Sequence, residues 1–266
     1  MTANGPKGPK PSAAANGGSA PGVQSVERVI DLLEAMGDRD GEITLSELGA
    51  ETGLPMPTIH RLLRTLSGRG YVRQLPSRRY TLGPRLIRLG ESAGRRLGAG
   101  ARPHLEELAL ELGETVNLAM IDRDMAVYVA QASSAYSMRM FTEVGRRVYC
   151  HCTGVGKMVL SQVPDQTVRE IVARVGMPAL TEASITDVDA LLREMDRIRE
   201  RGYAVDDGEQ ELGVRCFAVP VPGAPTPAAV SVSGPATRAT YEFGEQAIPV
   251  LHDVAEQVSA ELISAN

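Results

Sequence analysis

Apolar residues near the start of the chain recur at the spacing of an α-helix. The intervals of three and four predict a helix that ends at Gly37, and the residues at this spacing are Val26, Val29, Ile30, Leu33 and Met36. The segment Thr44-Leu45-Ser46-Glu47 then has the form of a capping box, in which a threonine and a glutamate each bond the other's backbone amide. It predicts a second helix that turns Leu45 and Leu48 inward and ends at Gly53.

A third helix and a hairpin follow. Pro57 fits the first turn of a helix, where its missing N–H would be unpaired anyway. The predicted buried stripe is Ile59, Leu62, Leu63 and Leu66, and the opposite face carries Thr58, His60, Arg61 and Arg64. Residues 71–74 and 79–82 predict two strands around a turn at 75–78. Two short helices, a basic third helix and a hairpin predict a winged helix-turn-helix domain over residues 23–83.

Beyond Gly83-Pro84 the pattern predicts a linker helix over residues 84–100 and then a larger α+β domain over residues 101–266. The apolar stripe of the linker helix is narrow, which fits either packing on a partner chain or an ordinary linker. In the larger domain we expect an antiparallel sheet. The expected strands cover 115–121, 125–132, 203–206, 214–221 and 228–233, with an extended stretch at 137–141, and the expected helices cover 105–112, 154–160, 165–175, 187–201 and 243–263.

Charge separates the two halves of the chain. The 266 residues carry a net charge of −5, but residues 1–90 hold 12 basic and 8 acidic residues, and residues 91–266 hold 16 and 25. Between Thr52 and Gly90 there are eight arginines and no acidic residue. A run of one sign over a helix and a hairpin is what neutralisation of DNA phosphates requires. The candidate DNA-binding residues are Thr44, Thr58, His60, Arg61, Arg64, Arg78 and Arg79.

The remaining composition narrows the class of protein. Residues 1–22 are rich in Pro, Gly, Ala and Ser, which predicts a disordered tail. No apolar run is long enough for a transmembrane helix, and we expect a cytoplasmic protein. Three cysteines do not make a disulfide framework.

Two motifs near the middle of the chain could be taken for metal or nucleotide sites. Cys150, His151 and Cys152 are immediate neighbours and lack the spacing of a zinc site, so we expect no metal and no cofactor. The stretch Thr153-Gly154-Val155-Gly156-Lys157 departs from a phosphate-binding loop, because Met158 stands where a Ser or Thr is needed. A helix beginning at Gly154 could still bind a carboxylate through its free N–H groups, or the glycines could serve packing alone.

Small polar residues gather on the later strands. Ser231 and Ser233 are two apart and share one face of a strand, as do Val214 and Cys216. With Asp206 and Asp207 they could line a pocket for a small polar ligand, or they could be ordinary strand residues. No Ser or Cys stands beside a His or Lys in a recognisable nucleophile motif.

The ordered chain, about residues 24–264, resembles the IclR family of bacterial transcriptional regulators. The resemblance rests on residues 25–29, 57–63 and 80–83, and on the motifs at 153–157, 202–209, 212–216 and 231–235. It implies a GAF-like effector domain behind the winged helix, and dimers joined through the DNA-binding domains and linker helices, often paired into tetramers. The implied effector-binding residues are Met140, Gly154, Val155, Asp206, Val214, Cys216, Ser231 and Ser233.

The resemblance also implies a function. We expect a repressor of small-acid catabolic genes, in allantoin and glyoxylate metabolism, that leaves its operator DNA when a small carboxylate such as glyoxylate or allantoate binds. Val155 departs from the alanine of small-acid sensors, and its larger side chain would narrow the pocket. The alternatives are an activator or a redox-responsive regulator of the same fold, and a hydrolase that uses Cys216 or Cys152.

Overall fold

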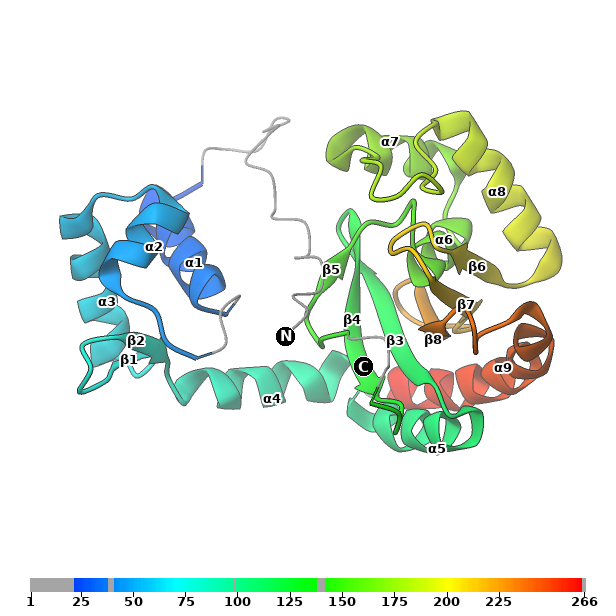
Figure 1. Ribbon diagram of the computed structural model, residues 1–266, viewed down its shortest axis with the longest axis horizontal. Coiled ribbons are helices and arrows are strands. Elements are labelled where there is room, and N and C mark those ends of the chain that lie inside the picture. Colours follow the sequence, from blue (N-terminus) through cyan, green and yellow to red (C-terminus); the bar gives the residue numbers. More distant parts are fainter. Residues whose placement is uncertain (1–21, 38–40, 98, 138–141, 265–266) are drawn as a thin grey trace. The chain divides into compact units, whose positions relative to one another are not determined.

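The computed structural model describes residues 22–37, 41–97, 99–137 and 142–264 of the chain (Figure 1). The described residues form two compact units, one made of residues 22–93 and the other of residues 94–264, and each is considered by itself. Helix α4 (Arg85–Leu97) contains the division between them. No described helix is long and apolar enough to cross a membrane.

The first unit consists of three helices and a small hairpin. Its elements are α1 (Gln24–Gly37), α2 (Leu45–Thr52), α3 (Met56–Gly68), β1 (Val72–Gln74) and β2 (Tyr80–Leu82). The two strands pair antiparallel, and Tyr80 also bridges to Ile43. The core between these elements contains Leu32, Leu48, Ile59 and Leu63, each no more than 1% exposed. This arrangement confirms the predicted winged helix-turn-helix fold.

Two local predictions in this unit were tested directly. The capping box is present, because Thr44 Oγ1 accepts from Glu47 N at 3.2 Å and Thr44 N donates to Glu47 Oε2 at 2.7 Å. The predicted α1 helix is present; of the apolar residues at helical spacing, Val29, Leu33 and Met36 pack in the core, while Val26 and Ile30 are 53% and 47% exposed. Leu32, which lies between these positions, is fully buried in the same core.

The second unit is built on one six-stranded antiparallel sheet. Its strand order is β5-β4-β3-β8-β7-β6. The first three strands of this unit therefore form one half of the sheet, the last three form the other half, and the halves are joined where β3 pairs with β8. The strands are β3 (Thr115–Asp122), β4 (Met125–Ala132), β5 (Arg147–Val148), β6 (Ala204–Asp207), β7 (Val214–Pro220) and β8 (Ala228–Pro235).

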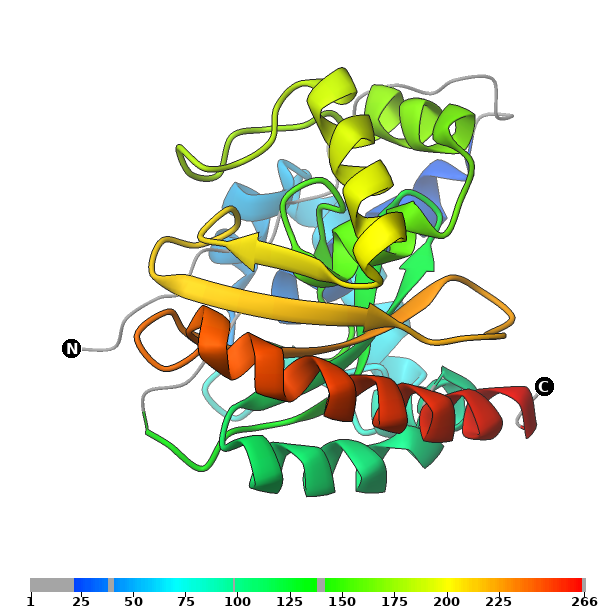
Figure 2. The same ribbon diagram turned by 90° about the vertical axis from the view of Figure 1, so that its right-hand side faces the viewer.

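Helices cover both faces of this sheet (Figure 2). One face packs against α5 (Arg102–Leu112) and α9 (Tyr241–Ser264), with a short 3-10 helix, η1 (Ala99–Ala101), before α5. The other face packs against α6 (Gly154–Ser161), α7 (Asp165–Val175) and α8 (Val188–Arg201). The predicted α+β fold with an antiparallel sheet is confirmed.

A bulge in β4 changes which of its side chains face α6. Leu118 of β3 pairs with Ala130, but the next residue, Ala119, pairs with Tyr128, so Val129 is the extra residue. Tyr128 and Gln131 are three positions apart and still lie on the same face of the sheet. Strand β5 was not predicted, and of the expected extended stretch 137–141 only Ser137 lies within the described residues.

Candidate functional site

The exposed face of α3 carries the predicted DNA-binding side chains. His60, Arg61 and Arg64 are exposed and Thr58 is half-buried, whereas Ile59 and Leu63 on the opposite face lie in the core. The helix is amphipathic because apolar residues recur at every third or fourth position. Three basic or polar groups therefore project from one helix surface, as a recognition helix requires.

The hairpin separates the two arginines that were predicted at its tip. Arg78 is exposed and sits in the turn with φ +63°. Arg79 instead points back into the unit, where Nη2 donates to the carbonyl of Glu42 at 2.9 Å and to Glu47 Oε2 at 3.2 Å. Thr44 is likewise engaged, as the cap of α2. These contacts give Arg79 and Thr44 a structural role, and their predicted contact with DNA stays a prediction.

In the second unit, the predicted effector residues lie in adjacent positions on the sheet face that carries α6. Asp206 pairs with Cys216 across β6 and β7, and Cys216 pairs with Ser233 across β7 and β8. Ser231 lies two residues before Ser233 on β8, so its side chain is on the same face. The exposure of Asp206, Cys216, Ser231 and Ser233 is 7% or less. Strands far apart in sequence thus form one row of buried polar side chains.

The start of α6 lies directly over this row. A Cβ atom on Gly154 would come within 2.8 Å of Cys216 Sγ, so a glycine is needed for this approach. Thr153 caps the helix by accepting from Gly156 N at 3.0 Å. Val155 is 1% exposed and packs in the core between α6 and the sheet. Val214 is half-buried at the start of β7, and Met140 lies outside the described residues.

A second carboxylate and a lysine add charge beside the row. Lys157 of α6 is buried and forms an ion pair with Glu209. Asp206 Oδ1 accepts from the backbone N–H of Glu209 at 2.8 Å and of Gln210 at 3.4 Å. Burial, followed by the negative charge of Glu209, raises the pKa of Asp206 to about 7. Lys157 is therefore occupied with Glu209 and is not placed as a phosphate-binding lysine.

Sequence reasoning missed a second group of buried polar side chains on the same face. Asn117 is fully buried, pairs with Ser231 across β3 and β8, and accepts from Thr142 Oγ1 at 2.7 Å. Gln131 of β4 donates to Thr142, and Tyr128 lies on this face as well. The available signal was Asn117 itself, a polar residue at an inward position of an otherwise apolar strand.

The Cys150-His151-Cys152 stretch forms a turn rather than a strand. All three side chains are buried, and His151 Nε2 lies 3.0 Å from the carbonyl of Pro178. Burial lowers the pKa of His151 and raises the pKa of both cysteines to about 12. Among the described residues, no group of three His, Cys, Asp or Glu side chains could hold a metal ion.

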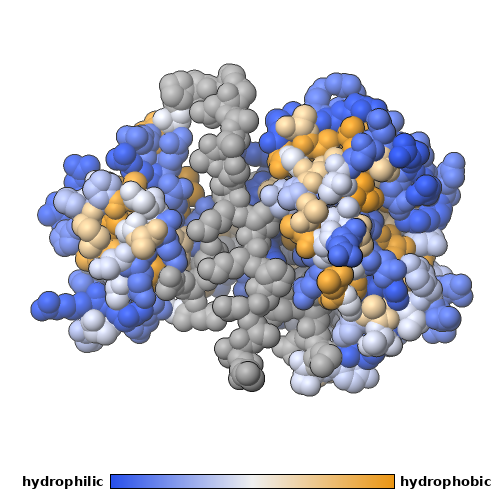
Figure 3. Space-filling view, turned by 45° about the horizontal axis from the view of Figure 1, so that its top comes forward, coloured by the Kyte–Doolittle hydropathy of each residue, from blue (hydrophilic) through white to orange (hydrophobic). Residues whose placement is uncertain are grey.

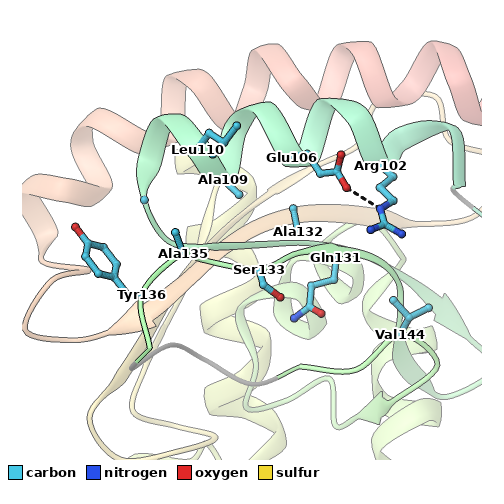
Figure 4. A pocket seen from close by; sticks show the side chains of 11 residues that line it. Arg102, Glu106, Ala109, Leu110, Gln131, Ala132, Ser133, Ala135, Tyr136 and Val144 are labelled. Carbon is cyan, nitrogen blue, oxygen red and sulfur yellow. Dashed lines mark hydrogen bonds and ion pairs between the residues drawn. The ribbon is translucent and has the colours of Figure 1, made fainter.

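A separate surface groove of about 850 Å³ lies between α5 and the end of β4 (Figure 4). Its walls include an ion pair between Arg102 and Glu106 at 2.7 Å and the exposed side chains of Leu110, Tyr136 and Val144. Of the predicted effector residues that the structure describes, none lines this groove.

Comparison with known proteins gives the class and then the family. Residues 25–76 match the IclR helix-turn-helix domain, and residues 94–260 match the C-terminal domain described as bacterial transcriptional regulator IclR C-terminal. A helix-turn-helix domain and an effector domain define a DNA-binding transcription regulator that responds to a small molecule. The chain belongs to the IclR family, whose members are transcription regulators and not enzymes.

Relatives match over nearly the whole chain. The HTH-type transcriptional regulator KdgR of Escherichia coli is 34% identical over 90% of this chain and 93% of its own length. The transcriptional repressor IclR of the same organism is 35% identical, over 87% of this chain and 89% of its length. The solved structure of IclR from Thermotoga maritima is 30% identical, with a TM-score of 0.73 over 90% of this chain and 98% of that chain.

Proposed function

We propose that this regulator is a repressor of small-acid catabolic genes, in allantoin and glyoxylate metabolism, and that a small carboxylate releases it from its operator. The observation that carries the proposal is the row of Asp206, Cys216, Ser233 and Ser231 beneath the start of α6. The N-terminus of a helix favours an anion, and buried hydroxyls supply hydrogen-bond donors beside it.

One poorly paired group in the row supports a ligand there. Ser231 Oγ is buried, and apart from the neighbouring thiol of Cys216, a weak partner, it has no hydrogen-bond partner among the described residues. A buried hydroxyl left without a partner costs about 1–3 kcal/mol, which a ligand oxygen would recover. In this proposal the effector carboxylate lies at Gly154 and Val155, and Asp206, Val214, Cys216, Ser231 and Ser233 surround the remainder. A relative named as a repressor supports the sign of regulation.

The same proposal assigns the parts of the chain. Residues 23–83 bind DNA, residues 84–100 link, residues 101–266 bind the effector, and residues 1–22 precede the DNA-binding domain as a tail. Thr58, His60, Arg61, Arg64 and Arg78 contact operator DNA, with Thr44 and Arg79 at the edge of that surface. The protein then works in the cytoplasm, where operator DNA and the small acid are both present.

Self-association is part of this proposal. Ile87 and Leu89 of α4 are 65% and 49% exposed, and Val26 and Ile30 of α1 are about half exposed. Apolar residues also interrupt the polar surface on the visible face of each unit (Figure 3). These side chains suit dimers joined through the DNA-binding domains and linker helices, and paired dimers would form tetramers. Sedimentation of Ile87→Glu beside the unsubstituted protein tests this part, with a lighter species expected for the variant.

The test of function is binding of the purified protein to DNA from upstream of its own gene. We expect specific binding that millimolar glyoxylate reverses. The double variant Ser231→Ala/Ser233→Ala should bind the same DNA and ignore glyoxylate. Binding that glyoxylate strengthens would identify an activator or a co-repressor mechanism instead, and binding that ignores glyoxylate and allantoate would remove the proposed effector class.

A further inference from the structure

Two buried polar groups face each other across β3 and β8. Asn117 and Ser231 are directly paired in the register, and both are fully buried. Paired residues on one face have Cβ atoms about 4.5–5.5 Å apart. Asn117 Nδ2 is nevertheless without a hydrogen-bond partner in the part of the chain that the structure describes, and Ser231 Oγ has only the neighbouring thiol of Cys216, a weak partner. Two adjacent, poorly paired groups in a closed core require a reason, because each is costly.

The amide of Asn117 is held in one orientation. Gln131 donates to the hydroxyl of Thr142, which therefore directs its own proton to Asn117 Oδ1 at 2.7 Å. Gln131 belongs to β4 and leaves it on the side away from α5 (Figure 4). Since β3 lies between β4 and β8, an amide whose oxygen is fixed on the β4 side directs its NH₂ group toward β8 and Ser231.

The position and charge of this pair define what it could bind. Asn117 and Cys216 lie on strands separated only by β8 and are offset by two residues along the strands, which places them about 12 Å apart. Both Asn117 Nδ2 and the Ser231 hydroxyl are neutral donors, so together they suit an uncharged oxygen. A second carboxylate at this depth would need a cation, and the buried Lys157 is already paired with Glu209.

We propose that Asn117 is a further effector-binding residue, which with Ser231 binds a neutral carbonyl oxygen at the far end of the effector. The effector is then an acid longer than glyoxylate, with a carboxylate at the start of α6 and an amide or ureido carbonyl at Asn117. Gln131 and Thr142 are positioning residues that hold the amide. This inference rests on the proposed function and adds the chemical class of the effector.

The test is calorimetric titration of the full chain with three probes: glyoxylate, allantoate and succinate. Allantoate carries ureido carbonyls, while succinate has a second carboxylate at similar reach. We expect allantoate to bind at least tenfold more tightly than either other acid, because it alone satisfies both donors. Asn117→Leu should remove that advantage and leave glyoxylate affinity within twofold.

Two further variants keep the outcome clear. Thr142→Val retains Asn117 but removes the hydrogen bond that orients its amide. It should weaken allantoate binding by a smaller factor than Asn117→Leu does. Ser134→Ala removes partly buried hydrogen bonds to Gly113 and Tyr136 outside the polar row, and should change neither affinity.

The results separate the inference from the proposed function. The inference alone would be overturned if Asn117→Leu and Thr142→Val lost equal affinity for glyoxylate and allantoate, or if neither variant lost affinity for either acid. Tighter binding of succinate than of the other two acids would also overturn it. Failure of the unsubstituted protein to bind any of the three acids would overturn the proposed function and this inference with it.

Discussion

Lys157 and Glu209 form a buried ion pair between residues 52 positions apart in the sequence. The lysine side chain is 2% exposed and the glutamate side chain 11% exposed. The pair joins the first turns of α6 to the loop after β6, next to Asp206. A charge of either sign left alone at this depth would be strongly unfavourable.

This pair gives a double-substitution test. Lys157→Met and Glu209→Leu should each lower the free energy of unfolding by about 3–5 kcal/mol, because each leaves one buried charge unpaired. The double variant should recover most of that loss. Urea unfolding followed by circular dichroism measures all four proteins, and Arg169→Ala with Asp189→Ala, an exposed pair, is the matched control. Additive losses in the buried pair would contradict the coupling.

The pKa of Asp206 predicts a pH dependence of stability. Its folded-state pKa, about 7, lies above the ordinary value of 3.8, so folding favours the protonated form. The stabilisation from this group is complete below about pH 4 and is lost as the pH rises to about 7. Asp206→Asn stays neutral, so its stability should increase relative to the unsubstituted protein across that interval.

Urea unfolding at a series of pH values measures this difference. Asp165→Asn, an exposed carboxylate beside Arg199, is the control. A difference between Asp206→Asn and the unsubstituted protein that is constant from pH 4 to pH 8 would show that Asp206 is ionised throughout.

The three cysteines are expected to resist oxidation. All are buried, and burial raises the pKa of Cys150 and Cys152 to about 12 and, together with the charge of Asp206, that of Cys216 to about 11. Thiolate reactivity requires an accessible group with a low pKa. A chromogenic disulfide reagent should therefore label no cysteine quickly in the folded protein and three after denaturation. Rapid labelling of one thiol in the folded protein would contradict this expectation and favour a redox-responsive regulator.

The basic surface predicts a change in the salt dependence of DNA binding. Arg64→Ala and Arg78→Ala remove exposed guanidinium groups, so each should weaken DNA binding. Each should also reduce, by about 1, the slope of the logarithm of the binding constant against the logarithm of the salt concentration. Arg79→Ala should change the slope less, because the Arg79 guanidinium is already paired with Glu42 and Glu47. Fluorescence anisotropy at several salt concentrations measures this, with Arg169→Ala as control. Unchanged slopes for Arg64→Ala and Arg78→Ala would contradict the proposal that these arginines contact DNA.

Most elements could be predicted from the sequence because their signals are local. Thr44 and Glu47 are three residues apart and form the expected cap, and α7 occupies the predicted residues 165–175. The pairing of Arg79 with Glu47 could not be predicted, since 32 residues separate them and only the folded chain brings them together.

The polar site was predicted only in part for the same reason. Ser231 and Ser233 share a face by simple alternation, which the sequence shows. Asn117 joins them through the pairing of β3 with β8, strands more than a hundred residues apart in sequence.

The bulge at Val129 determines which side chains of β4 face α6. Side chains alternate strictly along a regular strand, so one inserted residue reverses the facing of everything beyond it. Val129 and Ala130 both lie in the core beneath α5 and α9, and this lets Gln131 return to the face of α6. If all residues from Tyr128 onward alternated strictly, Gln131 would face the apolar core, whereas deleting Val129 would remove the bulge and leave Gln131 opposite Asn117. The hydrogen-bond chain to Asn117 thus depends on a local irregularity of β4 as well as on the residues that form the chain.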